Sequence, residues 1–221
     1  MNSVHNSGKV DGRTSREHTR DGILNAAREM FARDGYEGFS MRRLADDLGC
    51  AVGTPYVHFK SKEELFQTLV EQSFERLYQF LSGLRDRHQN GDPVVVLKKG
   101  MYTYIQFGLQ NANDYRFAFL LRAPSADQPY RVHPAFEVMR FMVTRCVREG
   151  RFRKVDVETV AQALWAAIHG ITSLLIQRPN FPWVGRAKVI EQVINNAVDS
   201  LIAQPAPGPA EGVDHEDLTC S

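Results

Sequence analysis

Apolar residues along most of this chain recur every three to four positions, the spacing that places them on one face of an α-helix. The alternation of apolar and polar residues that is typical of strands is almost absent. The segments with helical spacing are residues 16–33, 41–48, 52–59, 62–88, 92–110, 114–121, 134–149, 155–177 and 186–203. The pattern therefore predicts an all-α fold of about nine helices.

Short polar signals mark where several of these helices begin and end. Thr14-Ser15-Arg16-Glu17 and Ser61-Lys62-Glu63-Glu64 have the form of a capping box, in which a hydroxyl and a nearby carboxylate satisfy the first free N–H groups. Ser40 is expected to cap the next helix in the same way. Gly35 and Gly49 stand where a helix end favours a left-handed residue.

Two of the predicted helices are short and close together. Met41–Leu48 and Val52–Phe59 are joined at Gly49 by a turn of about three residues, the spacing of a helix-turn-helix. A helix of this size fits the major groove of B-DNA, which is roughly 12 Å wide. Gly53 and Thr54 at its leading turn allow a close approach of the backbone. This segment therefore predicts DNA binding.

Several side chains around this turn carry groups suited to DNA. Tyr56, His58 and the lysines can donate to phosphate oxygens, and Thr54 and Pro55 are placed to contact bases. The full set expected at DNA is Ser40, Arg42, Arg43, Val52, Gly53, Thr54, Pro55, Tyr56, His58, Lys60 and Lys62. Other roles remain open for three of them. Tyr56 could pack on the first helix, His58 could cap the next helix, and Arg43 could pair with Asp46 or Asp47.

The same stretch closely resembles the DNA-binding region of TetR-family transcriptional repressors. The resemblance rests on Ser40, Gly49, Gly53-Thr54-Pro55-Tyr56-Val57-His58-Phe59 and Lys62, together with Ile23–Ala27 and Phe31–Tyr36 of the first helix. It implies a homodimeric, ligand-responsive repressor that binds a pseudo-palindromic double-stranded DNA operator. One position departs from the family's pattern, because Ala51 stands where a capping Ser or Thr is common.

A second, weaker resemblance involves Trp165, His169 and Gly170, which are similar to the W-x-x-x-H-G element of one C-terminal subclass of that family. The last two long helices are too apolar for one buried stripe each, so we expect them to form a two-fold interface with their symmetry mates. The residues expected at this dimer interface are Trp165, His169, Gly170, Leu174, Val193, Ala197 and Leu201. His169 is expected to be a core or interface histidine rather than a metal ligand.

These features divide the chain into four parts. Residues 1–13 form a polar leader expected to be disordered, and residues 14–62 form the helix-turn-helix domain. Residues 63–203 are expected to bind a ligand and to dimerise. Residues 204–221, rich in Pro and acids, are expected to be a disordered tail.

Composition narrows the functional classes. The chain has 27 Lys and Arg against 26 Asp and Glu, a formal charge of +1, which excludes nucleic-acid binding by bulk positive charge. Its 3 Cys form no C-x-x-C and no Cys/His cluster, so neither a disulfide scaffold nor a structural zinc site is expected. No secretion signal opens the chain, and the most apolar window, residues 163–176, is too short to span a bilayer. We expect a cytoplasmic protein with no metal, no cofactor and no membrane partner.

The remaining functional expectation is a binding site for an apolar or aromatic small molecule. The catalytic motifs H-E-x-x-H and G-x-S-x-G are absent from the sequence, as is a Gly-rich phosphate loop. We therefore do not expect an enzyme. Phe107, Phe119, Met139 and Trp165 are the residues proposed to line the ligand cavity. Two alternatives stay open: an activator or pleiotropic regulator on the same fold, and a small-molecule-binding protein whose degenerate head no longer binds DNA, which Ala51 alone supports.

Overall fold

The computed structural model describes residues 12–121 and 133–203, and these residues confirm the all-α prediction. Their helices are α1 Gly12–Gly38, α2 Met41–Asp47, α3 Thr54–His58, α4 Lys62–Arg87, α5 Pro93–Gln110, α6 Ala112–Tyr115, the π-helix η1 Arg116–Leu120, α7 Pro134–Arg148, α8 Val157–Gln177 and α9 Arg186–Asp199. Most of the expected leader, the expected loop at 124–129 and the expected tail lie outside the described residues.

Capping explains where the helices of the N-terminal part begin. The Ser61 hydroxyl accepts the backbone N–H of Glu64 at 3.1 Å, and the Glu64 carboxylate accepts the N–H of Lys60 at 2.6 Å. Ser40 caps α2 through the Arg43 N–H. The other expected capping box, at Thr14, is wrong because α1 already begins at Gly12.

Some expected boundaries also needed correction. The helix predicted over 52–59 covers only Thr54–His58, so Val52 lies in the turn before it. The helix predicted over 114–121 is divided into α6 and a π-helical turn. The last helix ends at Asp199 rather than Ala203, because Ile202 leaves it to form an isolated antiparallel bridge with Phe152.

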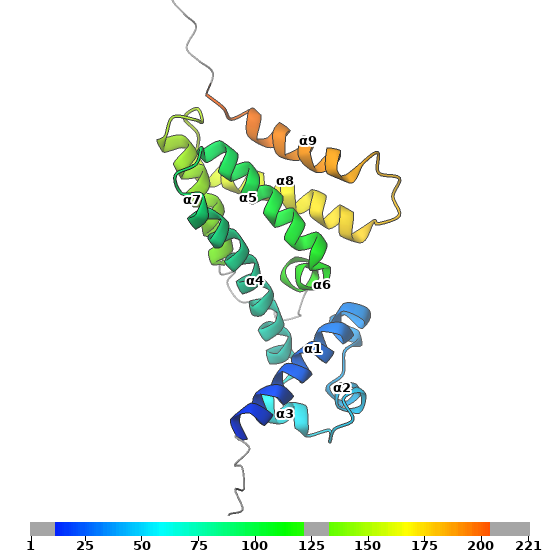
Figure 1. Cartoon of the computed structure of the whole chain (residues 1–221). Helices are drawn as coiled ribbons and strands as arrows, with labels where there is room; N and C mark the ends of the chain where they lie inside the picture. The colour runs from blue at the N-terminus through cyan, green and yellow to red at the C-terminus, as the bar shows by residue number, and fades with distance from the viewer. Residues whose placement is uncertain (1–11, 122–132, 204–221) are drawn as a thin grey trace, which may run out of the picture.

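The buried apolar residues form two clusters, which we call the head core and the body core. The head core joins α1, α2, α3 and the first turns of α4 around Phe31, Leu44, Phe59 and Phe66. The body core lies among α4, α5, α7, α8 and α9. Helix α4 contributes to both cores and runs from one to the other (Figure 1).

Helix α8 corrects one expectation about membranes. At 21 residues it is long and apolar enough to cross a bilayer by length and composition, so the argument that its apolar window is too short does not hold for the whole helix. Core helices of globular proteins meet the same criteria. Leu164, Ile168 and Leu175 of α8 are buried in the body core, where the helix packs against α5, α7 and α9.

Candidate nucleic-acid interface and ligand cavity

Helix α3 presents one face to the head core and the other to solvent. Pro55 is buried at the first turn and Phe59, just after the helix, is 1% exposed. Tyr56 and Val57, on the opposite side, are 51% and 66% exposed. The turn before the helix is fixed by a hydrogen bond from the Thr54 N–H to the Ala51 carbonyl at 2.8 Å. Tyr56 and Val57 are therefore the α3 side chains available to a partner.

Two residues of α3 differ in exposure from what the sequence prediction assumed. Pro55 was expected to contact bases, but it is buried at the first turn of α3, which disfavours a contact with DNA. Val57 was missed. Its position, two residues from both Pro55 and Phe59, places it on the far side of the helix from the core, and that spacing could have identified it.

The basic side chains around α3 differ in how they are held. The Arg43 guanidinium pairs with Asp34 of α1 at 3.0 Å and donates to the Gly38 carbonyl at 3.3 Å, so its partner is neither Asp46 nor Asp47. The Lys62 ammonium lies 4.3 Å from the centroid of the Tyr36 ring, in a cation–π contact. Arg42 and Lys60 are exposed.

The other residues expected to contact DNA are half-buried or exposed. Ser40 uses its hydroxyl as a helix cap, and Thr54 and His58 are half-buried at the two ends of α3. Gly53 and Val52 are exposed in the turn before it. Apart from Pro55, all of the expected DNA residues are therefore exposed or half-buried.

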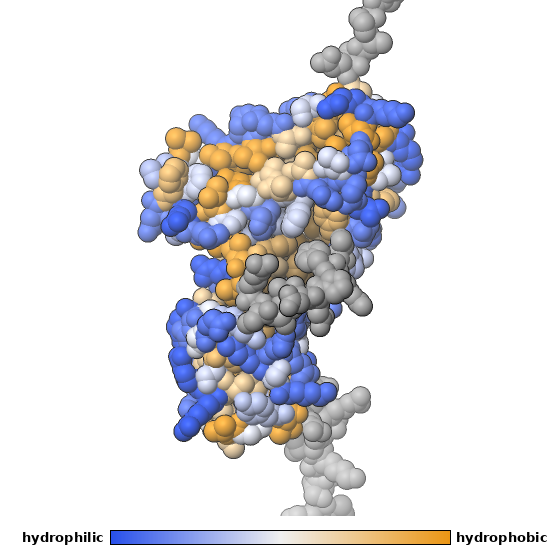
Figure 2. Space-filling view, turned by 180° about the vertical axis from the view of Figure 1, so that it is seen from behind, coloured by the Kyte–Doolittle hydropathy of each residue, from blue (hydrophilic) through white to orange (hydrophobic). Residues whose placement is uncertain are grey.

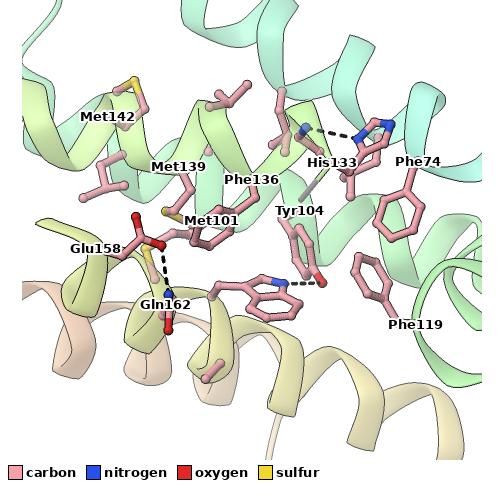
Figure 3. Close-up of a pocket in the computed structure, with 18 residues that line it drawn as sticks. Phe74, Met101, Tyr104, Phe119, His133, Phe136, Met139, Met142, Glu158 and Gln162 are labelled. Carbon is pink, nitrogen blue, oxygen red and sulfur yellow. Dashed lines mark hydrogen bonds between the residues drawn. The ribbon is translucent and has the colours of Figure 1, made fainter. Parts of the chain in front are cut away.

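A cavity of about 460 Å³ lies inside the body. Helices α4, α5, α7 and α8 form its walls and Phe119 of η1 lies at one end (Figure 3). Phe119, Met139 and Trp165 line it, as expected. Phe107 does not, because its buried ring packs in the body core with its centroid 5.5 Å from that of Phe80. Most lining residues that the sequence did not single out are apolar, among them Phe74, Met101, Phe136 and Met142.

A continuous chain of hydrogen bonds runs from the cavity into the body core, beginning at the lining residues Trp165 and Tyr104. The Trp165 indole N–H donates to the Tyr104 hydroxyl at 3.3 Å, which donates to the Tyr115 hydroxyl at 3.3 Å. The Tyr115 hydroxyl lies 2.6 Å from Nδ1 of His169, where the chain ends. Burial raises the pKa of Tyr115 and lowers the pKa of His169, so both rings are neutral near pH 7.

The residues expected at a dimer interface differ in exposure, and their role there stays a prediction. Trp165 and His169 are half-buried and hydrogen-bonded to Tyr104 and Tyr115 of the body. Leu201 is only 7% exposed and belongs to the body core. Of the remaining residues, Leu174 is 51% exposed, and Gly170, Val193 and Ala197 are half-buried.

A buried carboxylate links head and body. Asp114 of α6, 4% exposed, accepts hydrogen bonds from Arg28 of α1, from Arg76 of α4 at 2.6 Å and from the Ser73 hydroxyl at 3.3 Å. Burial lowers the pKa of Arg28, and the Asp114 carboxylate opposes that effect. The sequence offered no signal for this site, because Arg28 and Asp114 are 86 positions apart and belong to no common motif.

The described residues offer little for catalysis or metal binding. They contain no group of three or more His, Cys, Asp and Glu side chains that could hold a metal ion. Cys146 is fully buried, and burial raises the pKa of its thiol to about 12, which disfavours the reactive thiolate.

Two family models match the chain. The model described as "Bacterial regulatory proteins, tetR family" matches residues 23–69, and "Tetracyclin repressor-like, C-terminal domain" matches residues 97–201. The transcriptional repressor AcnR of Corynebacterium glutamicum is 29% identical over 165 residues, which cover 72% of this chain and 82% of AcnR. The transcriptional regulator UidR of Escherichia coli is 43% identical over 63 residues, 28% of this chain and 32% of UidR.

Solved structures share the fold at low identity. A Rhodococcus protein of unknown function has a TM-score of 0.70 at 20% identity, covering 84% of this chain and 96% of that one. The Bacillus subtilis regulator FadR, solved in complex with stearoyl-CoA, has a TM-score of 0.63 at 17% identity, covering 82% of this chain and 98% of FadR. Neither the family models nor the relatives distinguish the W-x-x-x-H-G subclass, which stays a prediction.

Proposed function

The chain belongs to the TetR family of bacterial transcription regulators, which are not enzymes, and we propose that it is a homodimeric repressor released from a pseudo-palindromic operator by an apolar or aromatic effector. The observation that carries the proposal is a head with an exposed α3 joined, through α4 and η1, to a body with an apolar cavity. As a DNA-binding regulator it would act in the cytoplasm.

The exposed face of α3 supports the DNA-binding part of the proposal. Tyr56 can donate its hydroxyl to phosphate, and the Val57 side chain is suited to an apolar contact with a thymine methyl group. Lys60 and Lys62 stand near the start of α4, whose free N–H groups also favour phosphate. Gly53, Thr54 and Arg42 complete a compact set of contacts that does not require a high net charge.

The surface of the body supports the dimer. Apolar side chains are exposed on α8 and on the segment that follows it, where Leu174, Phe181 and Val184 are 51%, 56% and 91% exposed. Figure 2 shows apolar residues on the surface of the body. Joining two copies through this region would orient two heads toward half-sites roughly 34–36 Å apart, one turn of DNA.

The link at Asp114 supports release by a ligand. Asp114 ties α6 to the head through Arg28 and to α4 through Arg76. The next turn, η1, carries Phe117 in the head core and Phe119 in the cavity. A ligand that binds more tightly to one arrangement of η1 and α4 would shift the spacing of the heads, which is all that coupling between the two sites requires.

A gel-shift experiment on the promoter region of the protein's own gene tests the proposal. Tyr56→Ala combined with Lys62→Ala should weaken the shift by about tenfold or more, the loss expected for two DNA contacts. Tyr102→Ala is the matched control, because Tyr102 is an equally exposed tyrosine of the body, at 47%. Thermal unfolding of both variants separates lost contacts from lost fold, since Lys62 also packs on Tyr36.

The outcome also separates the alternatives. A double variant that binds like the wild type would show that α3 is not the DNA-binding element. A wild type that shifts no DNA would favour a degenerate head. Reporter output with and without the gene distinguishes a repressor from an activator.

A further inference from the structure

The cavity in the body has an unusual charge balance. Among the described residues that line it, none is Lys or Arg, and the ionisable side chains are Glu158, His133 and Tyr104. His133 accepts the Ala135 N–H at 3.2 Å through Nδ1, and burial lowers its pKa, so its ring is neutral near pH 7. The Tyr104 hydroxyl already donates a hydrogen bond to the Tyr115 hydroxyl. Glu158 is therefore the charged group of the lining.

The partners of Glu158 do not cancel its charge. Its carboxylate accepts from the Gln162 amide at 2.8 Å and lies 3.3 Å from the Arg140 guanidinium. Arg140 is shared with Glu137, at 3.2 Å, so this group of two carboxylates and one guanidinium carries a net negative charge. The Glu158 side chain is 49% exposed, which places it where the cavity meets solvent.

The rest of the lining is almost entirely apolar, and it includes four aromatic rings and three methionines, which are Phe74, Phe119, Phe136, Trp165, Met101, Met139 and Met142. The Phe136 and Trp165 rings stand edge to face with centroids 6.0 Å apart, and the Phe119 centroid lies 6.3 Å from that of Trp165 (Figure 3). Aromatic faces attract cations, and sulfur groups such as those of Met101 and Met139 adapt to aromatic ligands. An anion in the same place would be desolvated without a counter-charge in the lining.

We propose that the cavity takes a lipophilic cation, with an aromatic body among Phe119, Phe136 and Trp165 and an ammonium group directed toward Glu158. This inference rests on the proposed function only in giving that ligand the role of effector. It excludes carboxylate ligands such as fatty-acid anions as the preferred class, because a buried carboxylate would face aromatic rings and the Glu158 charge.

Calorimetric titration of the full chain with three naphthalene probes tests the proposal. The probes share one aromatic body and differ in charge: (2-naphthylmethyl)trimethylammonium, 2-naphthylacetate and 2-(2-naphthyl)ethanol. We expect the ammonium compound to bind about tenfold more tightly than the carboxylate, with the alcohol between them. Equal or tighter binding of the carboxylate, or no binding of the ammonium compound, would overturn the proposal.

Two variants locate the effect. Glu158→Gln should weaken ammonium binding by about fivefold, the size of a partly exposed ion pair, and leave the alcohol unchanged. Glu191→Gln is the matched control, because Glu191 is an exposed glutamate of α9 that neither lines the cavity nor belongs to the Arg140 group. Met139→Trp should fill the cavity and abolish binding of all three probes, and ammonium binding that survives it would place the site elsewhere and overturn the proposal.

The proposed function is tested separately. If the protein shifts its promoter DNA but prefers the carboxylate probe, the regulator proposal stands and the cation proposal fails. If the protein binds no DNA but prefers the ammonium probe, the cation proposal stands and the regulator proposal fails.

Discussion

Phe117 is buried in the head core and Phe119, two residues further along η1, lines the ligand cavity. The Phe117 ring packs edge to face on Phe31 of α1, with centroids 6.0 Å apart. The Phe119 ring packs on Phe74 and Tyr115 of the body, with centroids at 5.1 and 4.9 Å. One short π-helical turn therefore touches both the proposed effector site and the proposed DNA-binding unit.

Phe119→Leu should reduce the coupling between effector and operator. The smaller side chain still fills part of the cavity but transmits less displacement to η1, so the operator affinity should change less when the ligand is added. The measurement is the ratio of operator affinities with and without saturating naphthyl ammonium probe. Phe136→Leu is the matched control, since Phe136 lines the cavity from α7, which carries no head-core residue. Equal ratios in the two variants would contradict a route through η1.

Asp114→Asn should destabilise the fold strongly. The substitution removes the negative charge that Arg28 and Arg76 share, and Arg28 is largely buried with 16% of its side chain exposed. Breaking a buried pair costs about 3–5 kcal/mol, and the partial exposure of Arg76 places the expected loss near the lower end, about 3 kcal/mol. Urea unfolding measures it. Asp86→Asn, at an exposed ion pair with Arg85, should leave the free energy of unfolding almost unchanged.

The positions of the helices and of several helix ends could be predicted from the sequence. Ser40, Ser61 and Gly49 mark helix ends through short-range hydrogen bonds and a left-handed turn with φ of 64°, which depend only on neighbouring residues. Helical periodicity likewise identified the body helices within a few positions. The burial of Pro55 could have been predicted in the same way, because Pro55 precedes the core residue Phe59 by four positions and so lies on the same side of α3.

Long-range pairing accounts for the remaining differences. Nothing near Arg28 indicates Asp114, and nothing near His169 indicates Tyr115 as its partner. Phe107 and Phe119 are both aromatic residues in apolar helices, and only the packing of α4 and α5 decides that Phe107 meets Phe80 while Phe119 meets the cavity. Local patterns therefore predicted the elements, whereas the lining of the site follows from their packing.

Gly108→Ala should destabilise the body because α5 and α8 approach closely there. A Cβ atom at Gly108 would lie 2.5 Å from Cγ2 of Thr172 and 2.8 Å from the Tyr115 ring. We expect a loss of about 1–3 kcal/mol in the free energy of unfolding, as for an overpacked core. Gly100→Ala is the control on the same helix. Its Cβ meets nothing within 4 Å, so it should stabilise the helix by about 0.5–1 kcal/mol. Equal effects at the two positions would contradict the close approach.

Val57→Ser should weaken specific operator binding without changing its salt dependence. The side chain is uncharged and 66% exposed, so its loss removes an apolar base contact and no phosphate contact. We expect about fivefold weaker binding to the operator and unchanged binding to random DNA. Lys60→Ala should instead weaken both and reduce the slope of log affinity against log salt by about 1. Fluorescence anisotropy at several salt concentrations measures both effects, and a reduced slope for Val57→Ser would show that its loss disturbs phosphate contacts.

Acid should destabilise the body through two half-buried histidines, His133 and His169. Burial lowers the pKa values of His133 and His169 in the folded chain, while in the unfolded chain both titrate near the ordinary value of about 6.5. Below that value the unfolded chain binds more protons than the folded chain, so the free energy of unfolding should fall as the pH drops from 7 to 5. The carboxylates with lowered pKa values, such as Asp92 and Asp156, add to this loss only at lower pH. His169→Gln retains an acceptor for the Tyr115 hydroxyl but cannot gain a proton, so its urea midpoint should change less over this range than that of the wild type. An unchanged pH dependence in both His169→Gln and His133→Gln would show that other groups control the acid sensitivity.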